Sequence, residues 1–280
     1  MTKWPLRFLP IAVFFIAVFF LGVFRAIWWQ YSATDISYNS DLFPELAPPS
    51  LAHPFGTTSL RQDVFVRIVD GFLTAVTVLS LGSITAIVFG IVLAFVSFVG
   101  GSWVDKTMSF LGDALYSIPS ILIALAVMIG TPSDSIKRYW IVIGSATLGV
   151  MLFFGAKIYR TLRVNISLNQ QSGYYAGAIA LGLPRVQIFF EHLLPNSMTG
   201  IRPLITGAGS DAILTLAGLG FIGVGISATD GADWGYDLSR GINDISQGVW
   251  WTTLFPAIAI SLTVLSFALT FERGGGNAKT

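Results

Sequence analysis

The feature that most constrains this chain is a series of long apolar runs. They cover about residues 8–29, 71–99, 109–130, 139–158, 200–225 and 249–270. Each run reaches or approaches the ~20 residues that a helix rising 1.5 Å per residue needs to cross a ~30 Å hydrocarbon core. The alternating pattern of a membrane β-barrel, with strands of ~10 residues, is absent. We therefore expect an all-α integral membrane protein with six transmembrane helices.

The composition agrees with a membrane protein and narrows the chemistry. Only 11% of the residues are charged, whereas an average soluble domain has roughly 25%. The net charge of +1 gives no reason to expect a nucleic-acid partner, and the absence of cysteine excludes disulfides and thiolate chemistry. No Ser/His/Asp, HExxH or paired-carboxylate arrangement occurs, so we expect no catalytic, cofactor-binding or metal site. An external contact of His53 and Asp63 with a binding protein or a metal is an open alternative.

The basic residues predict the orientation. With the N-terminus in the cytoplasm, ten of the 16 Lys and Arg residues lie on the inner side, among them Lys157, Arg160 and Arg163. Both termini are then cytoplasmic, with long external loops at 30–70 and 226–248 and an internal loop at 159–199. The run at residues 8–29 lacks a small-x-small cleavage site, so it is interpreted as an uncleaved anchor helix rather than a signal peptide.

The internal loop contains an unusual stretch. The sequence "SGYYAGAIALG", residues 172–182, predicts a short helix that Ser172 caps and Gly182 ends in the left-handed conformation. Pro184 then starts a second apolar segment, and Pro195 is expected to end it. We expect a helix, turn, helix unit that shows four side chains outward or toward a groove on a partner, Tyr174, Tyr175, Ala178 and Leu181. The alternative is an amphipathic loop that packs on its own bundle.

This stretch resembles the "EAA" signature of ABC-importer permeases. Gly177 and Ala178 stand at its two alanine places, Gly182 is its glycine, and "HLLPN" at residues 192–196 completes it. Ordered blocks elsewhere extend the resemblance over about residues 50–270: "HPFGTTSLRQDVFVRIVDG" at 53–71, "GGSWVD" at 100–105, and "LAGLGFIGVGI" followed by "DWG" at 233–235. The chain resembles the C-type permease subunit of dipeptide, oligopeptide and nickel ABC importers.

The resemblance implies a type I ABC importer permease fold with a cytoplasmic coupling helix, in the bacterial cytoplasmic (inner) membrane. It implies an anchor helix and external loop at residues 1–70 and a permease transmembrane domain at 71–280. It also implies transport of peptides or a similar small solute, a nickel chelate among them. The implied partners are a second related permease, two cytoplasmic ATP-binding subunits that hydrolyse the ATP, and an extracytoplasmic substrate-binding protein.

The same resemblance implies which residues couple to the ATP-binding subunits. They are Tyr174, Tyr175, Ala176, Gly177, Ala178, Leu181, Gly182 and Pro184. Ala176 replaces the acidic residue of the signature, so docking is expected to rest on shape and apolar contact rather than on an ion pair.

Asp211 is the one carboxylate expected inside a span. A charged group there is costly unless it faces a cavity or a partner, so Asp211 is a candidate for the translocation path. The alternatives are a structural contact with a neighbouring helix and a site near the inner mouth. Two other function classes remain open: a self-sufficient secondary transporter or channel, which should show more intramembrane charges or inverted repeats, and a membrane-embedded enzyme, which should show a catalytic constellation.

Overall fold

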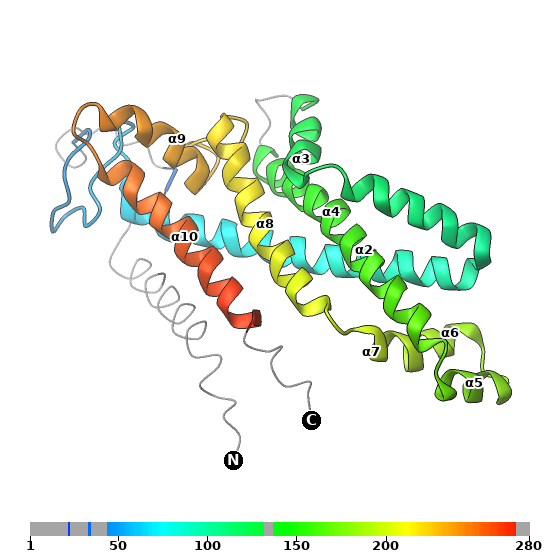
Figure 1. Ribbon diagram of the computed structural model, residues 1–280. Helices are drawn as coiled ribbons and strands as arrows, with labels where there is room; N and C mark the ends of the chain where they lie inside the picture. The colour runs from blue at the N-terminus through cyan, green and yellow to red at the C-terminus, as the bar shows by residue number, and fades with distance from the viewer. Residues whose placement is uncertain (1–21, 23–32, 35–43, 132–136, 273–280) are drawn as a thin grey trace, which may run out of the picture.

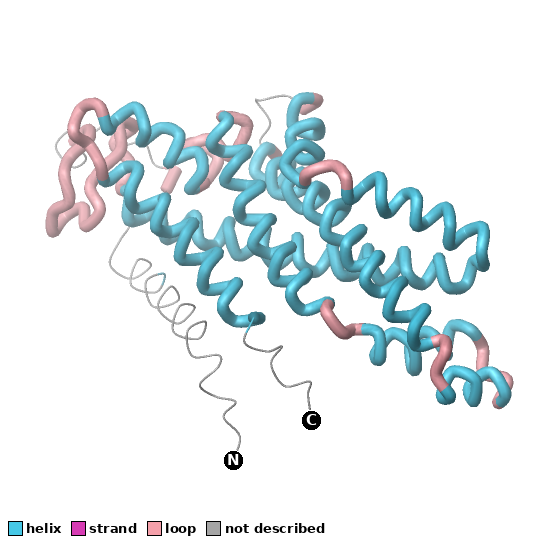
Figure 2. Tube along the Cα trace, in the orientation of Figure 1, coloured by secondary structure: helices cyan, strands magenta, loops and turns pink. Residues whose placement is uncertain are grey.

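The structure, a computed structural model, describes residues 22, 33, 34, 44–131 and 137–272 of the 280-residue chain. Within these ranges the chain forms helices and no strands, which confirms the all-α class (Figures 1 and 2). They are α2 (Val64–Tyr116), α3 (Ser120–Ile129), α4 (Arg138–Asn169), α5 (Gly173–Ala180), α6 (Arg185–Gln187), a π-helix (Ile188–Leu193), α7 (Leu194–Ser197), α8 (Ile201–Ile222), α9 (Trp234–Ile245) and α10 (Trp251–Glu272). In this part of the chain, α2, α4, α8 and α10 are long and apolar enough to cross a membrane. The expected anchor at 8–29 falls, except for residue 22, outside the described residues.

Helix α2 folds back on itself at Gly101. Its 53 residues would extend about 80 Å at 1.5 Å per residue, far more than one bilayer crossing needs. Gly101 has φ 79° and ψ −173°, a conformation that glycine adopts without steric cost. Beyond it the chain reverses and runs back along α4 (Figure 1). Gly90, before the reversal, lies against Ile158 of α4, and Gly112, after it, lies against Tyr159. The element is therefore a hairpin of two helices that holds α4.

The expected span at 109–130 is wrong as a continuous helix. It stops at Tyr116 and resumes as α3 at Ser120. Pro119 has no backbone N–H and disfavours helical geometry in the residue before it. Its carbonyl oxygen instead accepts the N–H groups of Leu122 and Ile123, so a new helix starts there. The part of α2 after Gly101 and α3 are therefore two helices with a break between Tyr116 and Ser120.

Two other helix boundaries and one additional helix differ from expectation. Helix α4 continues to Asn169 instead of ending near residue 158, so Arg160 and Arg163 lie on a helix rather than in the expected internal loop at 159–199. Helix α2 begins at Val64 rather than at residue 71 because Asp63 caps it, accepting the N–H of Val66. The external loop at 226–248 contains α9, which no apolar run predicts. The expected division of the chain at residue 70 remains a prediction.

The core lies where α2, α4 and α8 meet. Val78, Val150 and Ala212 are fully buried there, one from each helix. The loops gather mainly at the α9 end of the bundle, whereas α5, α6 and α7 lie at the opposite end (Figure 2). The molecule therefore has two differentiated ends joined by long helices.

Candidate functional site

The short helices between α4 and α8, residues 170–200, form a unit that we call the coupling segment. Helix α5 begins after Ser172 and ends at a left-handed Gly182 with φ 72°, as expected from the sequence. The N–H of Leu183 donates to the carbonyl oxygen of Ala178, and that of Gly182 donates to Ile179, which closes the helix end. The Ser172 hydroxyl does not cap α5 but donates to the Asn169 carbonyl oxygen at the end of α4. The helix, turn, helix arrangement is confirmed.

The outward face of α5 differs from expectation in one respect. Leu181 is 80% exposed and Tyr174 40% exposed, whereas Ala178 is only 5% exposed and packs into the chain's own core. The expectation that Ala178 faces outward is therefore wrong. Ile179, which the sequence reasoning passed over, is 53% exposed in its place. Tyr175 is half-buried against the core.

Ala176, Gly177, Gly182 and Pro184 are also exposed. A Cβ built on Gly177 would meet nothing within 4 Å. The fold of this chain alone therefore gives no steric reason for glycine at position 177, where glycine costs roughly 0.5–1 kcal/mol of helix stability.

The second half of the coupling segment is anchored to α2. Phe189 is fully buried, and its ring centroid lies 5.1 Å from that of Phe95 and 5.7 Å from that of Phe98. Arg185 donates from Nη1 to the carbonyl oxygen of Val99, 3.1 Å away. The segment thus contacts α2 directly before its reversal at Gly101.

Pro195 does not end the second segment, contrary to the expectation from the sequence. In a continuous α-helix its ring would clash with the carbonyl group four residues earlier. The chain instead forms a π-helix before it, in which the N–H of Leu194 donates to Phe189, and Pro195 occupies the first turn of α7. The segment continues through Pro195 to Ser197.

The end of α4 holds the far end of the coupling segment. Asn165 donates from Nδ2 to the carbonyl oxygens of Ser197 and Thr199, each at 2.8 Å. Asn169 donates to the hydroxyl of Ser197 at 3.0 Å. A displacement of the segment would therefore act on α4 as well as on α2.

An ion pair ties the returning half of α2 to α4. Arg163 donates from Nε and Nη2 to the two carboxylate oxygens of Asp105, each at 2.7 Å. The Ser97 hydroxyl, from before the reversal, also donates to Asp105. These groups line a cavity of about 510 Å³ beside Gly101. The aspartate of the "GGSWVD" block therefore fixes the hairpin next to the coupling segment.

Asp211 lies on α8 among polar groups from α3 and α4. Its carboxylate interacts with the hydroxyls of Ser120 and Thr215 and with the charge of Lys157. Those two hydroxyls lie 3.0 Å apart. The Oδ2 atom of Asp211 is buried and has no hydrogen-bond partner.

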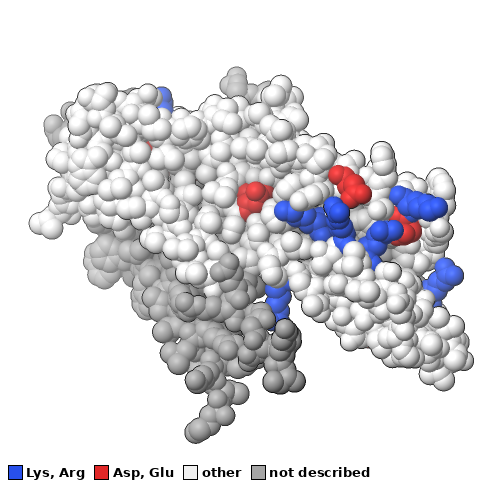
Figure 3. All heavy atoms as spheres, in the orientation of Figure 1, with Lys and Arg blue, Asp and Glu red and all other residues white. Residues whose placement is uncertain are grey.

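Lys157 lies near the part of α8 that carries Asp211, because the Phe154 ring beside it packs at Gly207 of α8. Its Nζ atom lies 5.2, 4.7 and 4.9 Å from the ring centroids of Tyr116, Phe153 and Phe154. This is cation–π distance. Figure 3 shows basic and acidic side chains close together over α4, α8 and the returning half of α2.

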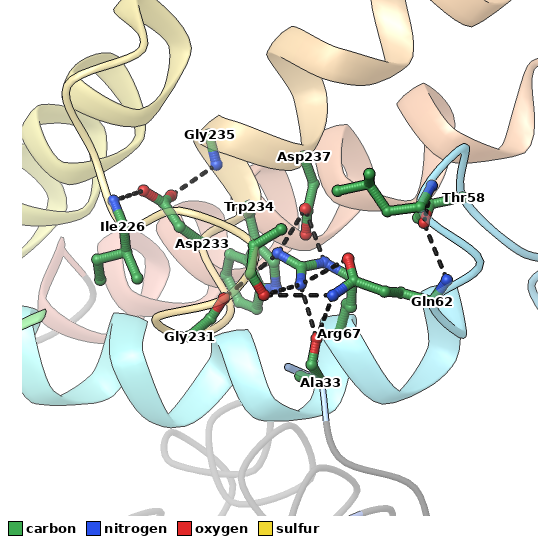
Figure 4. Close-up of polar contacts among 12 residues, drawn as sticks. Ala33, Thr58, Gln62, Arg67, Ile226, Gly231, Asp233, Trp234, Gly235 and Asp237 are labelled. Atoms are coloured by element: carbon green, nitrogen blue, oxygen red, sulfur yellow. Dashed lines mark hydrogen bonds and ion pairs between the residues drawn. The ribbon is translucent and has the colours of Figure 1, made fainter. Parts of the chain in front are cut away.

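The opposite end of the molecule is built around Arg67. We call this part, residues 44–67 and 223–250, the outer cap. Arg67 is 1% exposed, and it donates to Asp237, to Gln62 Oε1 and to three carbonyl oxygens, those of Ala33, Ala228 and Gly231 (Figure 4). A buried guanidinium needs such a full set of acceptors. Arg67 thereby joins the start of α2 to α9.

His53 and Asp63 contact each other inside the outer cap. His53 Nδ1 lies 2.8 Å from Asp63 Oδ2, and both residues are buried. This internal pair replaces the external contact that the sequence left open. Among the described residues, no three His, Cys, Asp or Glu side chains are grouped as metal ligands.

The "DWG" block locks α9 onto α8 and α2. Asp233 is 2% exposed and accepts the N–H groups of Gly235, at 2.9 Å, and Ile226, at 3.3 Å. A Cβ on Gly220 or Gly225 would lie 2.5 Å from its Oδ2 atom, so both glycines make room for the carboxylate. Burial raises the pKa of Asp233 to about 7.

Comparisons with known proteins agree with these features. Residues 86–273 match the family described as "Binding-protein-dependent transport system inner membrane component". The chain is 33% identical over 222 residues, 79% of its length and 70% of the relative's, to the "Dipeptide transport system permease protein DppC" of Alkalihalophilus pseudofirmus. It is 27% identical over 239 residues to the "Oligopeptide transport system permease protein OppC" of Bacillus subtilis, which covers 85% of this chain and 73% of the relative. It is 31% identical over 271 residues to the "Probable D,D-dipeptide transport system permease protein DdpC" of Escherichia coli, which covers 95% of this chain and 86% of the relative.

Proposed function

The chain belongs to the family of binding-protein-dependent transport system inner membrane components, and from this premise we propose what it carries and how it is driven. It is a multi-pass permease subunit of an ABC importer of the peptide family, and it is a transport subunit rather than an enzyme. We propose that its cargo is a peptide or a similar small solute, a nickel chelate among them. The names of the three relatives support a peptide.

The subunit works in a complex with other subunits. We propose that these are a second related permease, two cytoplasmic ATP-binding subunits and an extracytoplasmic substrate-binding protein. In this assignment the protein lies in the bacterial cytoplasmic membrane, with both termini and the coupling segment on the cytoplasmic side. The outer cap would then face the substrate-binding protein. The excess of Lys and Arg on the side of the coupling segment supports this orientation.

The observation that carries the coupling role is the exposed face of α5. Tyr174, Ile179 and Leu181 expose apolar surface at one end of the molecule, and such surface commonly marks a protein contact. Gly177 lies in the same helix with open space beside it, so a partner's backbone could approach closely. This combination supports docking of an ATP-binding subunit by shape and apolar contact.

The contacts of the coupling segment supply a route for the movement. A push on α5 reaches α2 through Phe189, and it reaches α4 through Asn165. Both helices run the length of the bundle (Figure 1). Closure of the ATP-binding subunits would therefore tilt α2 and α4 together, which is alternating access by rigid-body motion.

The distribution of charged residues supports a translocation path on the side of the bundle formed by α4 and α8. Asp211 and Lys157 are partly exposed on the side formed by α4 and α8. The exposed positions of α2 before Gly101 and of α10 form apolar rows instead: Leu81, Ile84, Val88 and Val92 on α2, and Leu254, Ile258, Leu262 and Leu265 on α10. Charges are costly in lipid. We therefore assign the apolar rows to lipid and the side with Asp211 to the path shared with the second permease.

Reconstitution of the whole complex tests this function. The subunit is purified in mild detergent, its associated subunits are identified, and the complex is placed in proteoliposomes with the substrate-binding protein outside. We expect ATP-binding subunits to co-purify and labelled peptide to accumulate only when ATP is supplied. Uptake without ATP, driven by an ion gradient, would favour the alternative of a self-sufficient secondary transporter.

A further inference from the structure

We propose that Lys157 and Asp211 form an open pair of opposite charges that binds the two charged ends of a zwitterionic cargo on its way through the membrane. The inference rests on the proposed transport of peptides and names two contacts that the cargo would make. It follows from the position of both groups and from the partners that they lack.

The surroundings of Lys157 stabilise its positive charge without a protein counter-ion. Three aromatic rings surround its ammonium group at 4.7–5.2 Å, two from α4 and one from the end of α2. The negative faces of such rings stabilise a cation in a poorly hydrated place. In the part of the chain that the structure describes, the ammonium group of Lys157 takes part in no salt bridge within 4.0 Å and no hydrogen bond. Its ammonium donors are therefore available to an anion.

Asp211 offers the complementary group. Its Oδ2 atom is buried and unpaired, although the carboxylate lies near the hydroxyls of Ser120 and Thr215. A buried acceptor without a donor is costly, so a structure seldom leaves one unless something else binds there. Asp211 as a whole is partly exposed, so a cargo ammonium group would bind its carboxylate from the exposed side.

The two groups attract each other without touching. Lys157 and Asp211 are neighbours, because the Phe154 ring beside Lys157 packs at Gly207, one helical turn before Asp211 on α8. Their charged atoms are nevertheless more than 4.0 Å apart, since no salt bridge joins them. A direct ion pair would occupy both groups, whereas an open pair can accept a molecule that carries both charges. A peptide with free ends has a carboxylate for Lys157 and an ammonium group for Asp211.

Thiol labelling tests the site directly, because the chain contains no cysteine. Asp211→Cys and Lys157→Cys are each assembled with all partner subunits, and labelling of this subunit is followed by mass spectrometry during ATP turnover. The probes are the anionic sulfonatoethyl and the cationic trimethylammonioethyl methanethiosulfonates. We expect the thiol at 211 to react faster with the anionic probe and the thiol at 157 with the cationic one. A cargo peptide with free ends should slow both reactions.

Leu262→Cys is the matched control, since this residue is 49% exposed in the apolar row of α10. It should react with neither probe. Absence of labelling at both 157 and 211 would overturn the proposal. Rates that do not respond to the peptide or to the charge of the probe would also overturn it.

Uptake measurements provide the second readout. Lys157→Met should lower uptake of a free peptide at least about tenfold, the loss expected for one charge-assisted hydrogen bond, and Lys157→Arg should restore much of it. Arg160→Gln, three residues on along α4 with its side chain 66% exposed, should leave uptake unchanged. If the unmodified complex shows no ATP-driven uptake, the proposed function fails. If it transports peptide but Lys157→Met transports as well, only this site is wrong.

Discussion

Arg67 and Asp237 are 170 positions apart in the sequence and are joined by two contacts of 2.7 Å, from Nε and Nη2 of the guanidinium to Oδ1 of the carboxylate. Arg67 belongs to the first turn of α2 and Asp237 to the first turn of α9. Their side chains are 1% and 10% exposed. This pair, with the carbonyl groups that Arg67 also binds, fastens the outer cap to the bundle.

Arg67→Met should destabilise the subunit severely. It leaves the Asp237 carboxylate and several carbonyl oxygens buried without a donor, and breaking one side of a buried pair costs about 3–5 kcal/mol. The apparent unfolding temperature in detergent, followed by tryptophan fluorescence, measures the loss. The control is Arg240→Gln, because Arg240 is exposed in the same cap. Equal effects of the two changes would contradict the role of Arg67.

Phe189→Ala should uncouple ATP hydrolysis from transport. Removing a fully buried aromatic ring costs about 3–5 kcal/mol of packing, and here the lost contacts are those that join the coupling segment to Phe95 and Phe98 of α2. We expect the ATPase activity of the complex to persist while peptide transported per ATP falls. Phe189→Leu keeps most of the volume and should retain more coupling. A fall in both activities by the same factor for both variants would indicate misfolding instead.

Gly177→Leu should weaken assembly with the ATP-binding subunits without destabilising the fold of this subunit. A Cβ atom added at this position meets nothing within 4 Å in this subunit, and leucine is a better helix former than glycine by roughly 0.5–1 kcal/mol. The unfolding temperature of the isolated subunit should stay constant or rise, whereas retention of the ATP-binding subunits should fall. Gly144→Leu is the control, since Gly144 is also helical with open space around it. Retention of the ATP-binding subunits by both variants would refute close docking at Gly177.

The stability of the outer cap should depend on pH through Asp233. Its pKa is about 7 in the folded protein against 3.8 for the ordinary group, so between these values the folded state binds the proton more tightly than the unfolded state. The contribution of Asp233 is thus most favourable below pH 4 and is lost as the pH rises to about 7, by on the order of 4 kcal/mol. Asp233→Asn should remove this slope. The measurement is the difference in unfolding temperature between the two proteins at pH 4, 5.5 and 8, and a constant difference would refute the assignment.

The sequence alone was sufficient to predict much of the coupling segment. Gly182 ends α5 in the left-handed conformation as expected, because such a glycine acts through hydrogen bonds within a few residues of itself. Helix α5 also begins after Ser172, although the expected cap by its hydroxyl is wrong. The face that α5 turns outward was not predictable from eight residues of small and apolar side chains. Ala178 is buried and Ile179 exposed because the π-helix packs against one side of α5. Burial in such a short helix depends on where its neighbours lie.

The apolar runs by themselves determined the fold class, since the length of a run decides whether a helix can cross a bilayer. Only the tertiary structure decided that α2 turns back at Gly101, that Lys157 lies among aromatic rings near Asp211, and that Arg67 meets Asp237. Periodicity and capping report interactions between residues that are close in the chain. These three features join residues that are distant in the chain, or depend on a glycine whose conformation the surrounding packing selects, so they follow from how the helices pack.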